Sequence, residues 1–425
     1  MGFIVFLLVT AIMIIRPTDF VPGLEGASLY LIAIVPCIVL SWHKLIPQLT
    51  MAGLRERPVL VFGIGIVLVS LFSSVAHRQF QIGFEVAVEH VKVLILYLLM
   101  LAHIDSPSRL KFFLGCLVGI ILIPILLAVL NYHGYIVIPA FRVMTESDDV
   151  QRLCGSGVFA DPNDVCEILN CAIFFSLYGL LDRSSGVARV IWLAPLALFG
   201  HALALTHSKG GFLGAVVGLV LLFKSRFRGI KSLVIAGMAL ALMFVLFAGR
   251  QTSLSTSEGT SQSRIQLWDA GFEMFKRSPL IGIGPGEFAG RMDHVAHNAF
   301  IQTCTELGFL GGTLLFGQYF YCLENLAKLR ATRTTISDPE LGRLQPFVLA
   351  SLASFATSEM SLTNPTSLVT YAMFGLATVF IRLADPSPPL PDLLLNRKLV
   401  QRIIVFSGLF LLGLYVFVRL NVAYG

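Results

Sequence analysis

The chain has 425 residues, of which 56% are hydrophobic and only 13% are charged, with a net charge of +6 and a mean hydropathy of +0.81. These values exclude an ordinary soluble globular protein, because apolar runs long enough to cross about 30 Å of hydrocarbon recur along the whole chain. The runs are nearly continuous rather than alternating, which excludes an outer-membrane barrel. The sequence therefore predicts an all-α integral membrane protein.

The apolar runs predict about twelve to thirteen transmembrane helices, and fourteen stays open because several runs are short. We expect N-terminal helices within 1–130, central helices within 164–248 and C-terminal helices within 299–425, with two long loops at 131–163 and 249–298. The predicted spans are 2–15, 28–42, 58–75, 91–104, 112–130, 164–181, 188–206, 210–223, 230–248, 299–322, 344–361, 366–382 and 403–419.

The lysines and arginines of the loops predict the orientation. With the N-terminus inside, the cytoplasmic loops hold more than half of the 31 basic residues, including the dense run KSRFRGIK at 224–231. This orientation places both long loops outside, with an amphipathic helix in the second. The basic residues that these loops carry against the topological bias are candidates for function: Arg142, Arg152, Arg250, Arg264, Lys276, Arg277 and Arg291.

The start of the chain and the cysteines narrow the class further. The first apolar run ends at Arg16-Pro17 rather than at a small-residue cleavage site, so no cleavable signal peptide is expected. The seven cysteines lie mostly in apolar runs and form no C-x-x-C pair. We therefore predict no structural metal, no disulfide framework and no cofactor.

The first outer loop ends in QRLCGSGVFADPNDVCE, which runs from Gln151 into a membrane helix. Asp161 and Asn163 suit the N-cap of a helix that begins near residue 164, so we interpret Asp-Pro-Asn as mainly structural. Arg152 is a candidate contact for a phosphate or a glycan. Further along, Lys209 follows His207-Ser208 in a short outer turn, where it either contacts a phosphate or satisfies the end of a helix near the headgroups.

The second outer loop contains RIQLWDAGFEMF, in which Ile265, Trp268, Phe272 and Phe275 recur at helical spacing. Such a helix is expected to lie along the outer face of the membrane with Trp268 at the headgroup level. Arg264 at its N-terminal end either faces a phosphate, which a guanidinium suits, or extends toward lipid headgroups.

The segment from 278 to 308 reads SPLIGIGPGEFAGRMDHVAHNAFIQTCTELG. Its glycines do not indicate a dinucleotide site, because no βαβ unit surrounds them, and we expect a flexible turn. His297 is either an interfacial residue that caps a helix or a proton acceptor for a hydroxyl. His294 does not complete a metal site with it. Glu306, nine residues into the helix that carries His297, is expected to orient a neighbour, to pair with an arginine, or to be only interfacial.

The order Arg-x-x-x-Trp, Ser-Pro-Leu-x-Gly-x-Gly-x-Gly, His-Asn and Glu-x-Gly resembles the C-terminal signature of the O-antigen ligase and O-antigen polymerase family. Gly-x-Phe-x-Asp-Pro-Asn in the first loop resembles the same family. These are membrane glycosyltransferases that use undecaprenyl-pyrophosphate-linked glycans as donors. The resemblance is specific over roughly 150–312.

The resemblance implies a role for each candidate. It makes His297 the catalytic base and gives Asn298, Glu306, Gly308 and Trp268 supporting positions. Arg264, Lys209 and Arg152 are the residues expected to bind the donor pyrophosphate. Lys209 departs from the family, which usually has Ser-Arg-Gly here, and an ammonium loses the bidentate fork of a guanidinium. The family is regarded as metal-independent.

The resemblance, together with the predicted orientation, implies a ligase-type glycosyltransferase on the outer face of a bacterial cytoplasmic membrane, with His297 as general base and inversion at the anomeric carbon. The acceptor is expected to be lipid A core, a protein or another glycan, with no nucleic-acid partner. A polymerase that joins repeat units is the alternative with the same chemistry. A non-enzymatic transporter of lipid-linked glycans is the alternative from another class. It predicts charges inside the membrane, and the predicted spans are nearly free of them.

Overall fold

The computed structural model describes residues 1–141, 143–145, 150–226, 259–331, 335–388, 390 and 393–424, together with the single positions 234, 237, 238, 241 and 243. Most of the predicted span 230–248 lies outside the described residues. The same is true of Arg142, Arg228, Lys231, Arg250 and Arg333.

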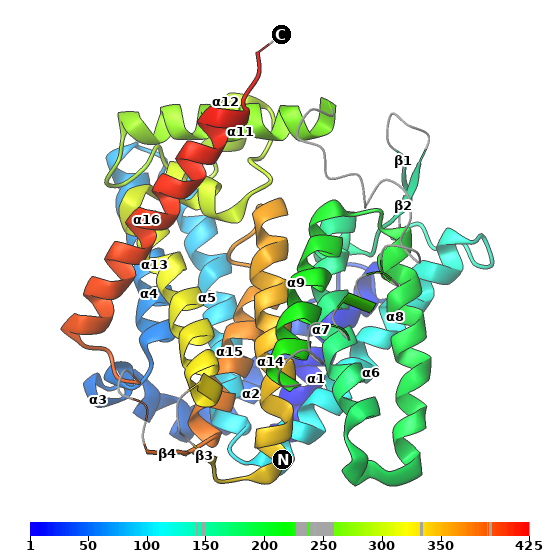
Figure 1. The fold of residues 1–425 in the computed structure, drawn as a ribbon. Coiled ribbons are helices and arrows are strands. Elements are labelled where there is room, and N and C mark those ends of the chain that lie inside the picture. Colours follow the sequence, from blue (N-terminus) through cyan, green and yellow to red (C-terminus); the bar gives the residue numbers. More distant parts are fainter. Residues whose placement is uncertain are drawn as a thin grey trace.

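The chain forms a helical bundle, which confirms the predicted all-α membrane class (Figure 1). Among the described residues, eight helical segments are long and apolar enough to cross a membrane. They comprise α1 (Gly2–Ile15) with η1 (Pro17–Asp19), α2 (Leu29–Leu49), α4 (Pro58–Ala76), α6 (Pro107–Tyr132), α7 (Pro162–Leu181), η3 (Arg183–Trp192) with α8 (Leu193–Leu205), α13 (Ala299–Ala331) and α16 (Arg397–Asn421).

Four further helices belong to the same bundle: α5 (Phe80–His103), α9 (Lys209–Arg226), α14 (Pro339–Ser358) and α15 (Leu368–Leu383). Each predicted span outside 230–248 therefore coincides with a helix. Two boundaries are wrong by more than two turns: α13 ends at Ala331 rather than at residue 322, and α5 begins at Phe80 rather than at residue 91. Its first turns carry Glu85, Glu89 and Lys92, which made this stretch resemble a loop.

The remaining elements are short or lie outside the bundle. They are α3 (Met51–Arg55), α11 (Gly259–Arg277), α12 (Glu287–Met292), η2 (Gly157–Phe159) and η5 (Glu359–Ser361). Strand β1 (Val143–Thr145) pairs antiparallel with β2 (Gln151–Leu153), with Met144 opposite Arg152. Strand β3 (Thr335–Ile336) pairs antiparallel with β4 (Pro386–Ser387).

Proline and a short polar cap begin several of these helices. Asp161 caps α7 by accepting a hydrogen bond of 2.7 Å from the backbone N–H of Asn163, while Pro162 occupies the first helical position. Asp338 caps α14 in the same way, with Pro339 next in the chain. The predicted capping role of Asp161 is confirmed, whereas Asn163 lies inside the helix.

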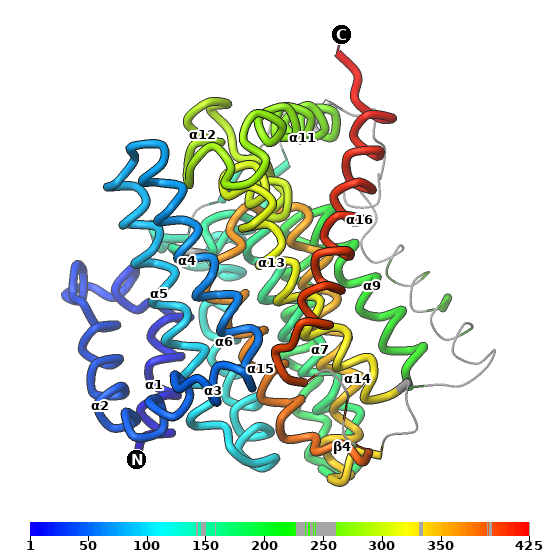
Figure 2. Tube along the Cα trace, turned by 90° about the vertical axis from the view of Figure 1, so that its left-hand side faces the viewer, coloured from blue at the N-terminus to red at the C-terminus, as the bar shows by residue number. Residues whose placement is uncertain are grey.

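Both long loops reach the same end of the bundle. Helix α11 lies across this end, the β1–β2 hairpin stands beside it, and the N-terminus lies at the other end (Figure 1). We call it the α11 end. Figure 2 shows α1 and α2 beside α5 on one flank of the bundle, where α2 packs against both.

Close helix packing positions the α11 end. Gly214 and Gly218 of α9 leave no room for a Cβ atom, because it would meet Ser358 of α14 at the first position and Phe174 of α7 at the second. Small residues at such positions let helix backbones approach closely in membranes. Helices α7, α9 and α14 are thereby held as a compact group.

Candidate functional site

His297 lies between α12 and α13 in the left-handed backbone conformation, with φ of 49°. It therefore precedes the helix rather than belonging to it. The next residue, Asn298, is fully buried and caps α13, because its Oδ1 accepts hydrogen bonds of 3.1 Å from the backbone N–H groups of Phe300 and Ile301. This cap fixes where the helix begins and leaves the half-buried His297 imidazole at its entrance.

The backbone before His297 is held from two sides. The indole Nε1 of Trp268 donates a hydrogen bond of 2.7 Å to the carbonyl oxygen of Ala296. The backbone N–H of Ala296 donates to Oε1 of Gln302 at 3.0 Å. Trp268 is partly buried and its indole N–H is bonded within the protein, while its predicted position at the headgroup level stays a prediction.

Glu306 continues this network. Its Oε1 accepts hydrogen bonds from Nε2 of Gln302 at 3.2 Å and from the backbone N–H of Phe288 at 3.3 Å. The carboxylate is thus held by an amide and a backbone donor, and it orients a neighbour as one of the predictions proposed. Through Gln302 it is connected to the residue that precedes His297.

The glycine-rich segment crosses α13 at Gly308, where the helix is broken. Gly308 has φ of 67°, and a Cβ atom there would meet the backbone of Leu280. Gly282 has φ of 71°, and a Cβ atom there would meet the backbone of Glu306. Backbone hydrogen bonds join the two segments, including Phe309 N–H to Pro279 O at 2.7 Å. The predicted flexible turn is therefore a tightly packed crossing, which needs glycine at both positions.

Arg152 lies in β2 and is 5% exposed. Its Nε donates to the carbonyl oxygen of Thr206 at 2.8 Å, and its Nη2 donates to Oδ1 of Asn163 at 3.3 Å. The same oxygen of Asn163 accepts a hydrogen bond of 2.6 Å from the hydroxyl of Ser208. Arg152 therefore connects the first long loop to the start of α7 and to the turn between α8 and α9.

Lys209 is the first residue of α9 and is half-buried. The hydroxyl of Ser208, just before it, accepts a hydrogen bond of 3.1 Å from the backbone N–H of Gly211. Because Ser208 also donates to Asn163, the turn that carries Lys209 belongs to the same polar cluster as Arg152.

Arg264 is in the second turn of α11 rather than at its N-terminal end, because the helix begins at Gly259. Helix α11 is anchored to the end of α16. Arg419 pairs with Asp269 at 3.1 Å, and the hydroxyl of Tyr424 donates to Asp269 at 2.6 Å. On its other face, Gly271 O accepts a hydrogen bond of 3.1 Å from Thr305 of α13.

Charged residues from several of these elements act on the pKa of His297. Burial is the main cause that lowers the pKa of the His297 imidazole below its ordinary value. The positive charge of Arg264 lowers the pKa further and that of Arg152 acts in the same direction, while the carboxylate of Asp161 opposes them. The imidazole is therefore neutral near pH 7 and lies within the field of two arginines from different loops.

Three side chains at this end hold the candidate residues in a way that was not predicted: those of Asn163, Ser208 and Gln302. Single polar residues at such positions have no distinctive spacing in the sequence. Helix α5 extends before its predicted span and there carries Glu85, Glu89 and His90, so the near-absence of charges within the spans stays a prediction.

The fold and the geometry together describe a polytopic helical membrane protein with a histidine and several basic residues gathered at one end. Residues 194–316 match the family model described as O-antigen ligase. This match confirms that the segment resembles the O-antigen ligase and polymerase family. The matched segment includes Lys209, Arg264, Trp268 and His297, whereas Arg152 lies before it. No match to the chain was found among curated proteins.

Proposed function

We propose that the protein transfers a glycan from undecaprenyl pyrophosphate to an acceptor hydroxyl on the outer face of the cytoplasmic membrane. The observation that carries the proposal is the convergence on His297 of positive charge from α11 and β2, in a chain whose matched family is O-antigen ligase. Its donor is a lipid-diphosphate glycan rather than a nucleotide sugar, because nucleotides are absent outside the cytoplasm.

Arg264, Arg152 and Lys209 bind the pyrophosphate of the donor. A guanidinium matches phosphate oxygens in a bidentate arrangement, and an ammonium supplies a point charge. These charges stabilise the negative charge that develops on the leaving group. Arg152 is already well ordered by its bonds to Thr206 and Asn163, so little side-chain entropy is lost when a ligand binds.

His297 is the general base. Its neutral imidazole takes the proton of the acceptor hydroxyl, whose oxygen attacks the anomeric carbon. The bond between that carbon and the pyrophosphate oxygen breaks, and the electron pair leaves with undecaprenyl pyrophosphate. A single direct displacement inverts the anomeric configuration. Trp268, Asn298, Gln302 and Gly308 hold the backbone around the base, because productive geometry requires an oriented base.

The test uses purified protein in liposomes with undecaprenyl-pyrophosphate-linked glycan and a panel of acceptors: lipid A core, protein and lipid-linked glycan. We expect release of undecaprenyl pyrophosphate that requires an acceptor and is abolished in His297→Ala. His294→Ala is the matched control, because His294 is an exposed neighbour.

The acceptor that supports release separates a ligase from a polymerase. Release at the wild-type rate in His297→Ala would contradict the general-base assignment. Movement of the donor between leaflets without release, for every acceptor, would favour a transporter.

A further inference from the structure

Two cavities lie next to one another between α1, α2, α4, α5 and the segment that joins η5 to α15. The larger has a volume of about 600 Å³ and the smaller about 200 Å³. Val86, Asn364 and Thr366 line both, so the cavities meet there. We call the two together the α5 groove. Its volume falls in the range of small-molecule sites.

The inner part of the α5 groove reaches the network that holds His297. Gln302 and Glu306 line the smaller cavity. Gln302 accepts the hydrogen bond from the backbone N–H of Ala296, next to His297. A ligand in the smaller cavity therefore contacts a residue that holds the backbone next to the proposed base.

Two buried polar side chains that line the smaller cavity, the inner part of the groove, each have an atom without a hydrogen-bond partner among the described residues. Ser70 and His90 are each 1% exposed, and both line the smaller cavity. The hydroxyl of Ser70 and Nδ1 of His90 have no hydrogen-bond partner in the part of the chain that the structure describes. Nε2 of His90 bonds the hydroxyl of Tyr371 at 2.5 Å. Unpaired buried polar atoms are unfavourable, so these two indicate a ligand that supplies hydroxyl groups.

The larger cavity forms the outer part of the groove, and its lining is polar but nearly balanced in charge. Glu85, Glu89 and Lys92 lie along one face of α5 and line the larger cavity. Lys92 pairs with Glu89 at 2.5 Å, and Arg16 at the rim pairs with Asp19 at 2.9 Å. Because its positive charges are already neutralised, the groove offers no cation for a pyrophosphate. Two carboxylates would repel that group.

The same lining does not suit a hydrocarbon chain. A polyprenyl tail in the groove would leave Glu85, Glu89 and the unpaired Ser70 hydroxyl against hydrocarbon, which is unfavourable for each group. Sugar hydroxyls instead donate to carboxylates, and the apolar face of a sugar ring packs on an aromatic side chain such as Tyr30, which lines the larger cavity.

We propose that the α5 groove binds the acceptor saccharide, a neutral and hydroxyl-rich glycan, and directs its nucleophilic hydroxyl toward His297. The acceptor then approaches along α4 and α5, while the anionic donor is held by residues of β2, α9 and α11. This assignment rests on the proposed function and adds the substrate class of the second site.

The test is steady-state kinetics in liposomes with the acceptor that supports transfer in the wild type. Thr366→Trp fills the point where the cavities meet, and Val137→Trp, 88% exposed in the first outer loop, is its control. The paired change Glu85→Gln with Glu89→Gln keeps the side-chain shapes, and Glu25→Gln at an exposed site is its control. We expect each groove variant to raise the acceptor KM roughly tenfold, with the donor KM unchanged.

Unchanged acceptor KM in both groove variants, with active wild type, would overturn the assignment. A rise in the donor KM alone would show that the groove holds the donor lipid and would overturn it equally. Wild-type protein that transfers to no acceptor would instead overturn the proposed function, and the acceptor groove with it. If Thr366→Trp does not fold, the glutamine pair alone decides, since neither glutamate is buried.

Discussion

The indole of Trp268 donates a hydrogen bond of 2.7 Å to the carbonyl oxygen of Ala296, the residue immediately before His297. The two residues come from different elements, because Trp268 belongs to α11 and Ala296 to the segment between α12 and α13. The bond therefore connects the helix that carries Arg264 to the backbone of the proposed base. The bond thereby fixes the position of α11 relative to the segment that carries His297, although both belong to one long loop.

Replacing Trp268 with Phe tests this connection. Phe keeps most of the apolar packing but cannot donate to Ala296, so the backbone of His297 loses one support. A lost hydrogen bond of about 1 kcal/mol predicts a fall in kcat/KM of roughly fivefold, with normal membrane insertion. Trp42→Phe, at a position 61% exposed, is the matched control and should keep wild-type activity. Equal activity in the two variants would mean that the indole does not position the base.

The pH profile tests His297 as the base. Its pKa lies below the ordinary value of histidine, chiefly through burial and then through the charge of Arg264. A base must be unprotonated, so kcat/KM should rise as the pH increases through this pKa and be level above it. A profile that falls over the same range contradicts a histidine base.

Changes at Arg264 should move that profile. Arg264→Gln removes a positive charge that lowers the pKa of His297, so the midpoint should shift to higher pH, with transfer reduced about tenfold through weaker donor binding. Arg264→Lys keeps the charge and should leave the midpoint in place while still weakening the bidentate contact. Arg277→Gln, at an exposed position of the same helix, is the control. A midpoint that does not move in Arg264→Gln would mean that the two side chains are not coupled.

Much of the fold could be predicted because hydrocarbon imposes a simple pattern on the chain. Apolar length alone located the helices, but it failed at the start of α5. Glu85, Glu89 and Lys92 lower the hydropathy of that stretch, and hydropathy cannot distinguish a helix face that lines a cavity from a loop.

The site was predictable only as a set of residues. Arg152 and Arg264 are far apart in the sequence, and their common action on His297 depends on how β2 and α11 pack. The bond from Trp268 to Ala296 could not be predicted, because an indole bonded within the protein and an indole at the membrane interface leave the same helical spacing. The break at Gly308 depends on the backbone of Leu280, which no local pattern reveals.

The crossing at Gly308 predicts a sharp effect of a single methyl group. Gly308→Ala adds a Cβ atom that meets the backbone of Leu280, at a positive φ that alanine rarely adopts. Backbone cannot move aside as a side chain can, so we expect a loss of stability on the order of 3 kcal/mol and loss of transfer.

Thermal unfolding in detergent measures this effect. Gly290→Ala is the matched control, because no atom lies within 4 Å of an added Cβ atom there and the position is helical. Its unfolding temperature should equal that of the wild type or exceed it slightly. A Gly308→Ala variant as stable as Gly290→Ala would contradict the tight crossing.

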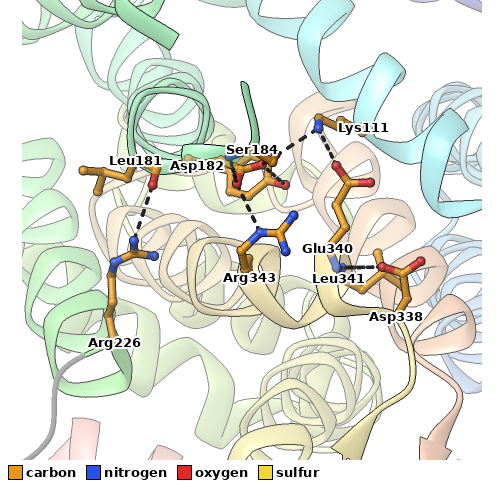
Figure 3. Close-up of polar contacts among 10 residues, drawn as sticks. Lys111, Leu181, Asp182, Ser184, Arg226, Asp338, Glu340, Leu341 and Arg343 are labelled. Carbon is orange, nitrogen blue, oxygen red and sulfur yellow. Dashed lines mark hydrogen bonds and ion pairs between the residues drawn. The ribbon is translucent and has the colours of Figure 1, made fainter. Parts of the chain in front are cut away.

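A buried carboxylate joins three helices at the other end of the bundle, where α7 ends and α14 begins (Figure 3). The Asp182 side chain is 1% exposed, and its Oδ1 pairs with Nε of Arg343 at 3.1 Å. Its Oδ2 accepts a hydrogen bond of 2.7 Å from the hydroxyl of Ser184 and lies 3.9 Å from Nζ of Lys111. Lys111 also pairs with Glu340, so α6, α7 and α14 are connected through charges.

Asp182→Asn should lower the stability by roughly 2 kcal/mol at pH 7. This is less than for a fully buried ion pair, because Arg343 and Lys111 are 44% and 40% exposed. Burial raises the pKa of Asp182, but the bonds from Ser184 and the charges of Arg343 and Lys111 outweigh it, so the pKa is lower than usual. A carboxyl whose pKa is lowered by folding stabilises the fold above its unfolded pKa, and this contribution is lost as the pH falls through the folded value.

The difference in unfolding temperature between wild type and Asp182→Asn should therefore be present at pH 7 and close as the pH falls below about 4. Asp105→Asn is the matched control, because Asp105 is 47% exposed and pairs with Arg109 at 2.8 Å on the surface. Its effect should stay below about 1 kcal/mol. Transfer per folded molecule should be unchanged in both variants, since the cluster is distant from the α11 end. A temperature difference that persists unchanged at low pH would show that the Asp182 charge does not stabilise this end.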